Sequence, residues 1–262
     1  MSLSASAKQV SIATGLYRPA RWLLRRVRPH KLRAFRADIE LYRSLIPRGA
    51  LCFDVGANIG EKSEAMWEAG ARVVAFEPNP LVLPELQARC GHRKNWSVVA
   101  TALGSGAGIT TLHARELHGT SSVAGDWELA GGVPAGDVIA TYNVPVVTLD
   151  SAIQRFGSPA FCKIDVEGWE LEVLEGLTQP IPVLSFEFQL TDHDIRKTIA
   201  CLEKLTKFGA SCANITPAET SSFHFTDWIP LDRFLAWFPG DLEESLPGEP
   251  YGDIFVRRHT AK

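Results

Sequence analysis

A chain of 262 residues, 45% of them hydrophobic, is long enough to bury one large core, and its composition excludes a disordered or fibrous protein. The formal net charge of −3 conceals an asymmetry, because residues 1–37 hold nine of the 27 Lys and Arg and none of the 30 acidic residues. Since the rest of the chain is acidic, we expect no nucleic-acid partner. The basic arm is typical of a solvated helix face, and association with an anionic membrane surface is the alternative.

The five cysteines are scattered along the chain, which argues against both a disulfide framework and a zinc site. The longest apolar stretches fall short of the roughly 20 residues that a membrane-spanning helix needs, and no secretory signal is recognisable. We therefore expect a cytoplasmic protein, with peripheral membrane association through the basic arm as an open alternative. Nothing in the sequence indicates the oligomeric state.

The first predicted elements are one or two helices within residues 17–45, which we assign to a basic N-terminal helical arm over residues 1–46. Short apolar runs then alternate with helical patterns, which is typical of a Rossmann-like α/β domain, here residues 47–262. In its first half we expect strands at 51–55, 72–76 and 97–103 and helices at 61–69 and 80–90.

The alternation breaks between residues 104 and 150, where we expect a hairpin within 108–114, a polar loop at 118–136 and a strand at 144–149. It resumes with strands at 161–165, 183–188, 210–215 and 252–257 and helices at 169–175 and 192–208. These elements predict a seven-stranded, mostly parallel sheet with helices on both faces. Residues 104–147 and 217–250 are then insertions that form the substrate side.

A glycine turn follows the first predicted strand. Asp54 ends that strand, and the turn from Gly56 to Gly60 brings backbone N–H groups to the carboxyl edge of the sheet, where open α/β sheets bind ligands. Glu77 ends the next strand, in a position from which a carboxylate can accept hydrogen bonds from both hydroxyls of a ribose. The alternative is a plain tight turn followed by an exposed acid.

The spacing of this turn is Asp-x-Gly-x-x-x-Gly, whereas dinucleotide enzymes usually carry G-x-G-x-x-G to let a pyrophosphate approach the backbone. Asp54 would repel a pyrophosphate but could help to hold the ammonium of S-adenosylmethionine. An NAD(P)-dependent oxidoreductase is therefore the disfavoured alternative. A non-catalytic nucleotide-binding protein is a second one.

Several separated segments carry a family resemblance: FDVGANIG at 53–60, VAFEPNP at 74–80, TLD at 148–150 and, most specifically, KIDVEGWE at 163–170 with VLEG at 173–176. They resemble the FkbM family of methyltransferases, whose members methylate hydroxyl groups on macrolides, saccharides and other metabolites. The resemblance covers about residues 50–190. It implies the class I methyltransferase fold, S-adenosylmethionine as cofactor, and O-methylation of a saccharide, polyketide or other small-molecule acceptor.

The candidate cofactor residues come from the turn, from the strand ends and from the irregular loop. Ala102 lies where an adenine would stack in this architecture, and Ser122 offers a small hydroxyl. The whole expected set is Asp54, Gly56, Asn58, Gly60, Glu77, Asn79, Ala102, Ser122 and Asp165.

The candidate catalytic residues are Asp165, Glu187 and His193. A hydroxyl acceptor must lose its proton to a base, or must bind a cation that lowers its pKa. Asp165 and Glu187 end adjacent strands and could act as the base together with His193, or Asp165 and Glu187 could share a Mg²⁺ ion. Structural alternatives are a capping role for Asp165 and His193 and a satisfied buried acid for Glu187. Lys163 is expected to pair with Glu167 or Glu187.

Overall fold

The computed structural model describes residues 10–14, 16–17, 28–91, 93–115, 120–123, 137–218, 220–238, 240, 245 and 251–258. Most of the predicted loop at 118–136, much of the N-terminal arm and nine of the ten residues at 241–250 lie outside the described residues. None of the described helices combines the length and the apolar character needed to cross a bilayer.

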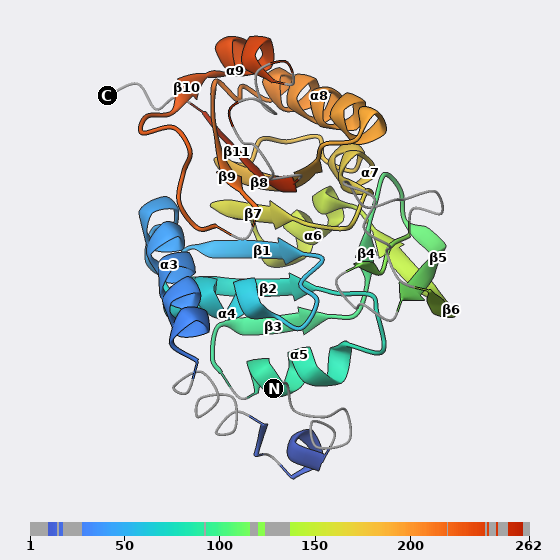
Figure 1. The fold of residues 1–262 in the computed structure, drawn as a ribbon. Helices are drawn as coiled ribbons and strands as arrows, with labels where there is room; N and C mark the ends of the chain where they lie inside the picture. The colour runs from blue at the N-terminus through green and yellow to red at the C-terminus, as the bar shows by residue number, and fades with distance from the viewer. Residues whose placement is uncertain are drawn as a thin grey trace.

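A twisted, mostly parallel sheet forms the centre of the molecule (Figure 1). Its strands are β1 (Leu51–Val55), β2 (Arg72–Phe76), β3 (Trp96–Val99), β7 (Phe161–Ile164), β8 (Val183–Gln189), β9 (Cys212–Pro217), β10 (Ile229–Pro230) and β11 (Tyr251–Arg257). The order across the sheet is β10-β9-β11-β8-β7-β1-β2-β3, and β11 runs antiparallel to both of its neighbours. The direction of strand succession reverses between β1 and β7, which creates the switch point at which such sheets bind ligands.

The strand count and two strand predictions were wrong. The sheet has eight strands instead of seven, because the short β10 pairs with the outer edge of β9. The strand expected at 97–103 is divided: β3 ends at Val99, and β4 (Ala102–Leu103) joins a separate three-stranded sheet. The hairpin expected within 108–114 is a single strand, β5 (Gly108–Arg115), which pairs antiparallel with the distant β6 (Val138–Val147).

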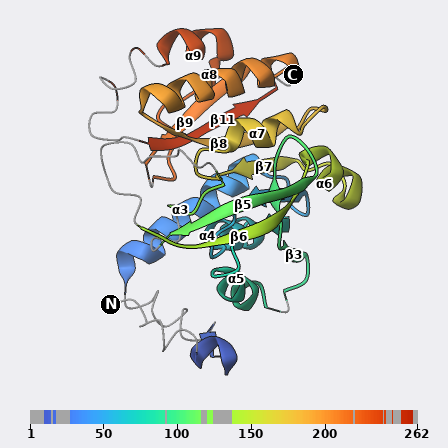
Figure 2. The ribbon, with the colours of Figure 1, turned by 90° about the vertical axis from the view of Figure 1, so that its right-hand side faces the viewer.

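The small sheet, in the order β4-β6-β5, stands beside the ends of β1, β2 and β3 toward which those parallel strands point (Figures 1 and 2). Its apolar side packs around Ala102, Leu112 and Val144. The chain then enters a helix that was not predicted, α6 (Leu149–Phe156), whose first turn is held by a reciprocal capping box between Thr148 and Ser151. The small sheet thus places a second wall over the carboxyl edge of the central sheet, while α6 packs on one of its faces.

Helices cover both faces of the central sheet, as predicted. On one face lie α3 (Pro29–Leu45), α4 (Glu61–Glu68) and α5 (Leu83–Cys90), and on the other lie α6, α7 (Glu170–Glu175), α8 (Asp192–Lys207) and α9 (Leu231–Trp237). The alternation of side chains along each strand feeds two separate apolar layers. Phe53 and Phe186 belong to the layer under α6–α9, and Cys52 and Phe161 to the layer under α3–α5.

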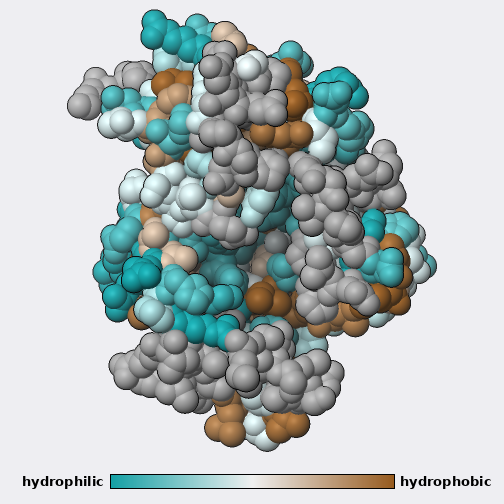
Figure 3. Space-filling model, in the orientation of Figure 1, coloured by the Kyte–Doolittle hydropathy of each residue, from teal (hydrophilic) through white to brown (hydrophobic). Residues whose placement is uncertain are grey.

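Helix α3 packs directly on the α/β domain. Leu41 and Tyr42 are buried against the sheet, and the ring of Tyr42 lies 5.7 Å from that of Phe161. Asp38 accepts a hydrogen bond from Lys62 Nζ of α4 (2.6 Å), while the outer surface over α3 is largely hydrophilic (Figure 3). The boundary between an arm at 1–46 and a domain from residue 47 remains a prediction.

Candidate active site

A pocket of about 640 Å³, counting its open mouth, lies at the carboxyl ends of β1, β2 and β7. The small sheet closes its far side with Leu112 of β5, and Ser121 and Val123 of the following segment line the same side. Ala102 and Leu103 supply an apolar wall, while Glu77 and Asp165 supply carboxylates. The pocket therefore stands at the switch point and combines an apolar wall with a few converging polar groups, which is the usual composition of a small-molecule site.

The turn after β1 depends on glycine at position 56. Gly56 has a φ of +81°, and a Cβ atom built there would lie 1.7 Å from the carbonyl oxygen of Asp165. Its N–H donates to the Phe76 carbonyl (3.0 Å), so the turn is held between β2 and β7. Only a residue without a side chain permits this approach, which leaves the backbone of the turn facing the pocket.

Glu77 is fixed by the turn it faces. Its Oε2 accepts a hydrogen bond from the Asn58 backbone N–H (2.7 Å), and its Oε1 accepts one from the Asn79 backbone N–H (2.8 Å). The residue is 6% exposed, and burial raises the pKa of its carboxyl to about 7 despite these two donors. Each oxygen keeps a further acceptor position, so the carboxylate can still receive two hydroxyl donors from a ligand.

Asp54 lies behind the turn and does not line the pocket. It is buried, it accepts a hydrogen bond from Ser63 Oγ of α4, and burial raises the pKa of its carboxyl. Gly60 (φ +80°) precedes the first residue of α4 and lies next to the Leu86 side chain. The backbone N–H of Asn79 donates to Glu77. These three predicted cofactor residues support the pocket wall from outside.

Three carboxylates converge where β7 and β8 end. Asp165, Glu167 and Glu187 each offer an oxygen, and these oxygens all lie within 4.8 Å of one another. Burial, followed by the charge of Asp165, raises the pKa of both Glu167 and Glu187 well above the usual value. Glu187 itself lies outside the set of pocket-lining residues, whereas the other two belong to it.

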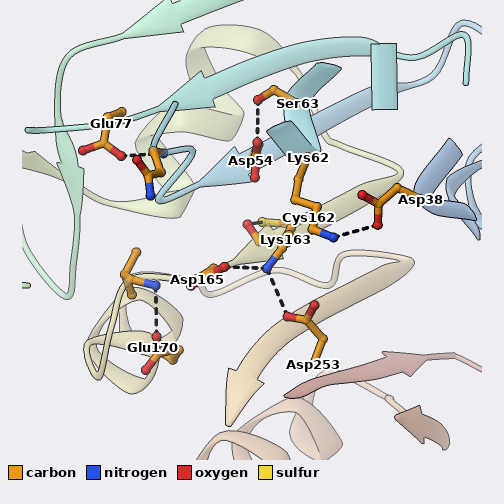
Figure 4. Close-up of polar contacts among 12 residues, drawn as sticks. Asp38, Asp54, Lys62, Ser63, Glu77, Cys162, Lys163, Asp165, Glu170 and Asp253 are labelled. Carbon is orange, nitrogen blue, oxygen red and sulfur yellow. Dashed lines mark hydrogen bonds and ion pairs between the residues drawn. The ribbon is translucent and has the colours of Figure 1, made fainter. Parts of the chain in front are cut away.

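The cation beneath this cluster is Lys163, and its predicted partners were wrong. Its Nζ donates to Asp165 Oδ2 (2.8 Å) and to Asp253 Oδ1 (3.0 Å), instead of pairing with Glu167 or Glu187 (Figure 4). Asp253 lies 90 residues further along the chain, on β11. No local spacing in the sequence could have pointed to that pair.

A model of the methyltransferase FkbM domain matches residues 54–209, more than half of the chain. The chain belongs to the FkbM methyltransferase domain family. The matched range contains the glycine turn, Glu77 and the three clustered carboxylates. The mostly parallel sheet with helices on both faces is the Rossmann-like α/β architecture expected from the sequence.

A curated relative is the hexuronic acid methyltransferase AglP of Haloferax volcanii, 26% identical over 163 residues. That match covers 60% of this chain and 63% of the relative, so the chain spans less than two thirds of the relative's length. Among solved structures, precorrin-6Y C5,15-methyltransferase from Geobacter metallireducens is similar with a TM-score of 0.43 and 12% identity, over 85% of this chain and 87% of that one. Aeropyrum pernix fibrillarin with bound S-adenosyl-L-methionine has a TM-score of 0.43 and 10% identity, over 81% and 68%.

Two further predicted site residues of this FkbM domain, His193 and Ser122, lie outside the pocket lining, as Asp54, Gly60, Asn79 and Glu187 do. His193 is exposed in the first turn of α8, which the Thr191 side chain caps by accepting a hydrogen bond from the Asp194 N–H. Ser122 is buried, and its Oγ donates to the Glu167 carbonyl, so its neighbour Ser121 is the residue that lines the pocket. The structure thus brings together Gly56, Asn58, Glu77, Ala102 and Asp165, and sets His193 apart.

Glu167 and Trp169 line the pocket but were not predicted as site residues. Glu167 has a φ of +57°, a left-handed backbone conformation that a Glu rarely adopts. Residue type alone therefore does not predict this conformation. The following Gly168 (φ +90°) and the Glu170 carboxylate, which accepts from the Val166 N–H (3.0 Å), complete this turn. The KIDVEGWE motif was a usable signal, because it spans the whole turn.

Proposed function

We propose that this chain is an S-adenosylmethionine-dependent O-methyltransferase that acts on a hydroxyl group of a saccharide or another small metabolite. The proposal is supported by one pocket at the switch point that is lined by the buried carboxylate of Glu77 and by Asp165 and Glu167, two of the three clustered carboxylates where β7 and β8 end. Membership of the FkbM family supports methyl transfer as the reaction, and the hexuronic acid named for AglP supports a saccharide acceptor.

The residues present fit this cofactor on their own chemistry. Glu77 would accept the ribose hydroxyls, and Ala102 and Leu103 would take the adenine. Asn58 Oδ1 and Trp169 Nε1 are buried, belong to pocket-lining residues, and have no hydrogen-bond partner among the described residues. A polar ligand such as a nucleoside would relieve the cost of leaving these atoms unpaired.

When bound, S-adenosylmethionine supplies a methyl group on a cationic sulfur that leaves readily as a neutral thioether. The protein must align the acceptor oxygen and remove its proton. Glu187 is our candidate for the base, with Asp165 and Glu167 beside it, because the carboxylate oxygens of the three residues lie within 4.8 Å of one another. Burial and the charge of Asp165 raise the pKa of the Glu187 carboxyl, which makes it a stronger base than an ordinary carboxylate. His193 would need to reach the site from an exposed position.

The same three carboxylates favour a second arrangement, in which Asp165, Glu167 and Glu187 hold a Mg²⁺ ion. Oxygen ligands suit this ion, and it would lower the pKa of an acceptor hydroxyl bound to it. Methyl transfer that stops with a chelator and returns with Mg²⁺ selects this arrangement over direct proton removal by a carboxylate.

The test is methyl transfer from isotopically labelled S-adenosylmethionine to a panel of hexoses, hexuronic acids and their glycosides, followed by mass spectrometry of the products. We expect one acceptor class to gain a single methyl group. Glu187→Gln should bind the cofactor but transfer at least tenfold more slowly, as expected for the loss of a base. Binding of NAD in place of S-adenosylmethionine would support the oxidoreductase alternative instead.

A cytoplasmic location and peripheral membrane association through the basic arm remain predictions. Flotation with anionic vesicles at low salt would detect such association, and protein that stays at the bottom of the gradient would exclude it.

A further inference from the structure

A polar layer crosses the sheet on the face that α3 and α4 cover. Asp54, Lys163 and Ser185 are register partners on β1, β7 and β8, and Glu187 and Asp253 are register partners on β8 and β11. Register partners project from the same side of a sheet, so these five side chains form two adjacent rows. The rows lie at the carboxyl end of the apolar layer that contains Cys52, Phe161 and Phe255.

Lys163 bridges this layer over an intervening strand. The order β11-β8-β7 puts β8 between the strand of Lys163 and the strand of Asp253, yet Nζ lies 3.0 Å from Asp253 Oδ1 and 2.8 Å from Asp165 Oδ2. The small side chain of Ser185, the register neighbour of Lys163 on β8, leaves room for this crossing and is itself 0% exposed. Lys163 is 3% exposed, so its ammonium has exchanged water for carboxylates.

The two acceptors of this ammonium differ in where they lie. Asp165 lines the cofactor pocket and belongs to the carboxylate cluster, whereas Asp253 lies outside the pocket lining. Other charged or titratable groups also act on Lys163 or feel its charge: Tyr42 from α3, Asp54 from β1, Glu167 before α7 and Glu187 from β8. One cation thus divides its charge between a carboxylate in the site and a carboxylate behind it.

We propose that Lys163 is a positioning residue for methyl transfer, which holds the Asp165 carboxylate at the methyl-donor end of the pocket and sets the electrostatic potential there by sharing its charge with Asp253. The inference rests on the proposed function, since it takes the cationic sulfur of S-adenosylmethionine to lie beside Asp165. A purely structural ion pair would stabilise the fold without acting on the charge of a ligand.

The two cofactor forms allow these roles to be separated, because S-adenosylmethionine carries a positive sulfur and S-adenosylhomocysteine a neutral one. Calorimetry gives the Kd of each form, and the ratio of the two values reports the potential at the sulfur. Removing one charge about 6 Å away at an effective dielectric constant of about 40 changes such a ratio roughly tenfold. Loss of stability alone would change both Kd values together.

Two variants should move the ratio in opposite directions. Lys163→Met removes the cation, so we expect binding at pH 8.5 to shift roughly tenfold in favour of S-adenosylmethionine. Asp253→Asn removes a negative charge that offsets part of the Lys163 ammonium, so the potential at the sulfur becomes more positive. We expect a shift of a few fold in favour of S-adenosylhomocysteine. Lys163→Arg keeps the charge and should restore the wild-type ratio. Asp253→Asn alone still decides the matter if Lys163→Met does not fold.

Arg89→Met is the matched control. Arg89 is also a buried cation, 1% exposed, and it pairs with Glu64 (3.0 Å) and Glu61 (3.5 Å) away from the pocket lining. We expect this variant to lose stability and to keep the wild-type ratio. Ratios within twofold of wild type in both Lys163→Met and Asp253→Asn, or shifts of the same sign, would overturn the proposal. Wild-type protein that binds neither form would overturn the proposed function, and this inference with it.

Discussion

The close approach of the glycine turn to β7 makes Gly56→Ala a severe substitution. The new Cβ would lie 1.7 Å from the Asp165 carbonyl oxygen, so one of the two backbones must retreat by at least 1.3 Å to reach even a 3.0 Å contact. That movement strains the hydrogen bond from the Asp165 N–H to the Val55 carbonyl (2.9 Å). The backbone, with φ +81°, adds its own cost for any L-residue.

The left-handed backbone costs about 1–2 kcal/mol for alanine, and overpacking adds about 1–3 kcal/mol. We therefore expect Gly56→Ala to lose about 2–5 kcal/mol of unfolding free energy. Gly49→Ala is the matched control, because Gly49 has nearly the same φ of +79° but no atom within 4 Å of the new Cβ. It should show the backbone cost alone, about 1–2 kcal/mol.

Urea unfolding followed by circular dichroism measures both losses. The extra cost in Gly56→Ala should lower its midpoint by about 0.5–1 M below that of Gly49→Ala. Cofactor affinity should fall in Gly56→Ala alone, because only that turn faces the pocket. Equal midpoints for the two variants, together with unchanged cofactor binding, would show that β1 and β7 do not approach each other as described.

Three further predictions concern buried or clustered carboxyl groups. Burial raises the pKa of Glu77 from 4.5 to about 7, so its contribution to stability is present below pH 4.5 and is lost as the pH rises through about 7. Urea unfolding should therefore give wild type and Glu77→Gln the same stability near pH 4.5. At pH 8, wild type should be up to about 3 kcal/mol less stable than Glu77→Gln. A constant difference across this range would contradict the burial of Glu77. Ser63→Ala removes the hydroxyl that donates to buried Asp54, and it should cost about 1–3 kcal/mol of unfolding free energy; a neutral effect would mean that water replaces that hydroxyl. If methyl transfer requires Mg²⁺, Glu167→Gln should weaken Mg²⁺ binding and raise the Mg²⁺ concentration that gives the half-maximal rate. An unchanged concentration would exclude Glu167 as a ligand.

Local signals in the sequence were sufficient for the first half of the fold. The run from Leu51 through the glycine turn to Glu77 predicted strand, turn, helix and strand, because each element there has its own periodicity and its own boundary residues. The placement of Gly56 and Glu77 on one pocket follows from strand ends that meet at one edge. The functional roles of these residues remain predictions.

Pairings between distant segments could not be predicted from the sequence. β5 finds its partner in β6 across a gap of more than twenty residues, so the strand pattern alone gave a false local hairpin. Lys163 pairs with Asp253 because β11 lies next to β8 in the sheet, and the sequence around Lys163 does not indicate the position of β11. Glu167 reaches the carboxylate cluster through a left-handed backbone, which side-chain patterns do not encode.

Calorimetric titration of wild type and Glu77→Ala with S-adenosylmethionine and S-adenosylhomocysteine, each with and without Mg²⁺, tests whether this pocket binds the cofactor through Glu77. We expect wild type to bind both forms and Glu77→Ala to lose at least tenfold in affinity for each, because two hydrogen bonds to a charged acceptor disappear. Wild-type protein that binds neither form under any condition, or Glu77→Ala that binds as tightly as wild type, would contradict this expectation.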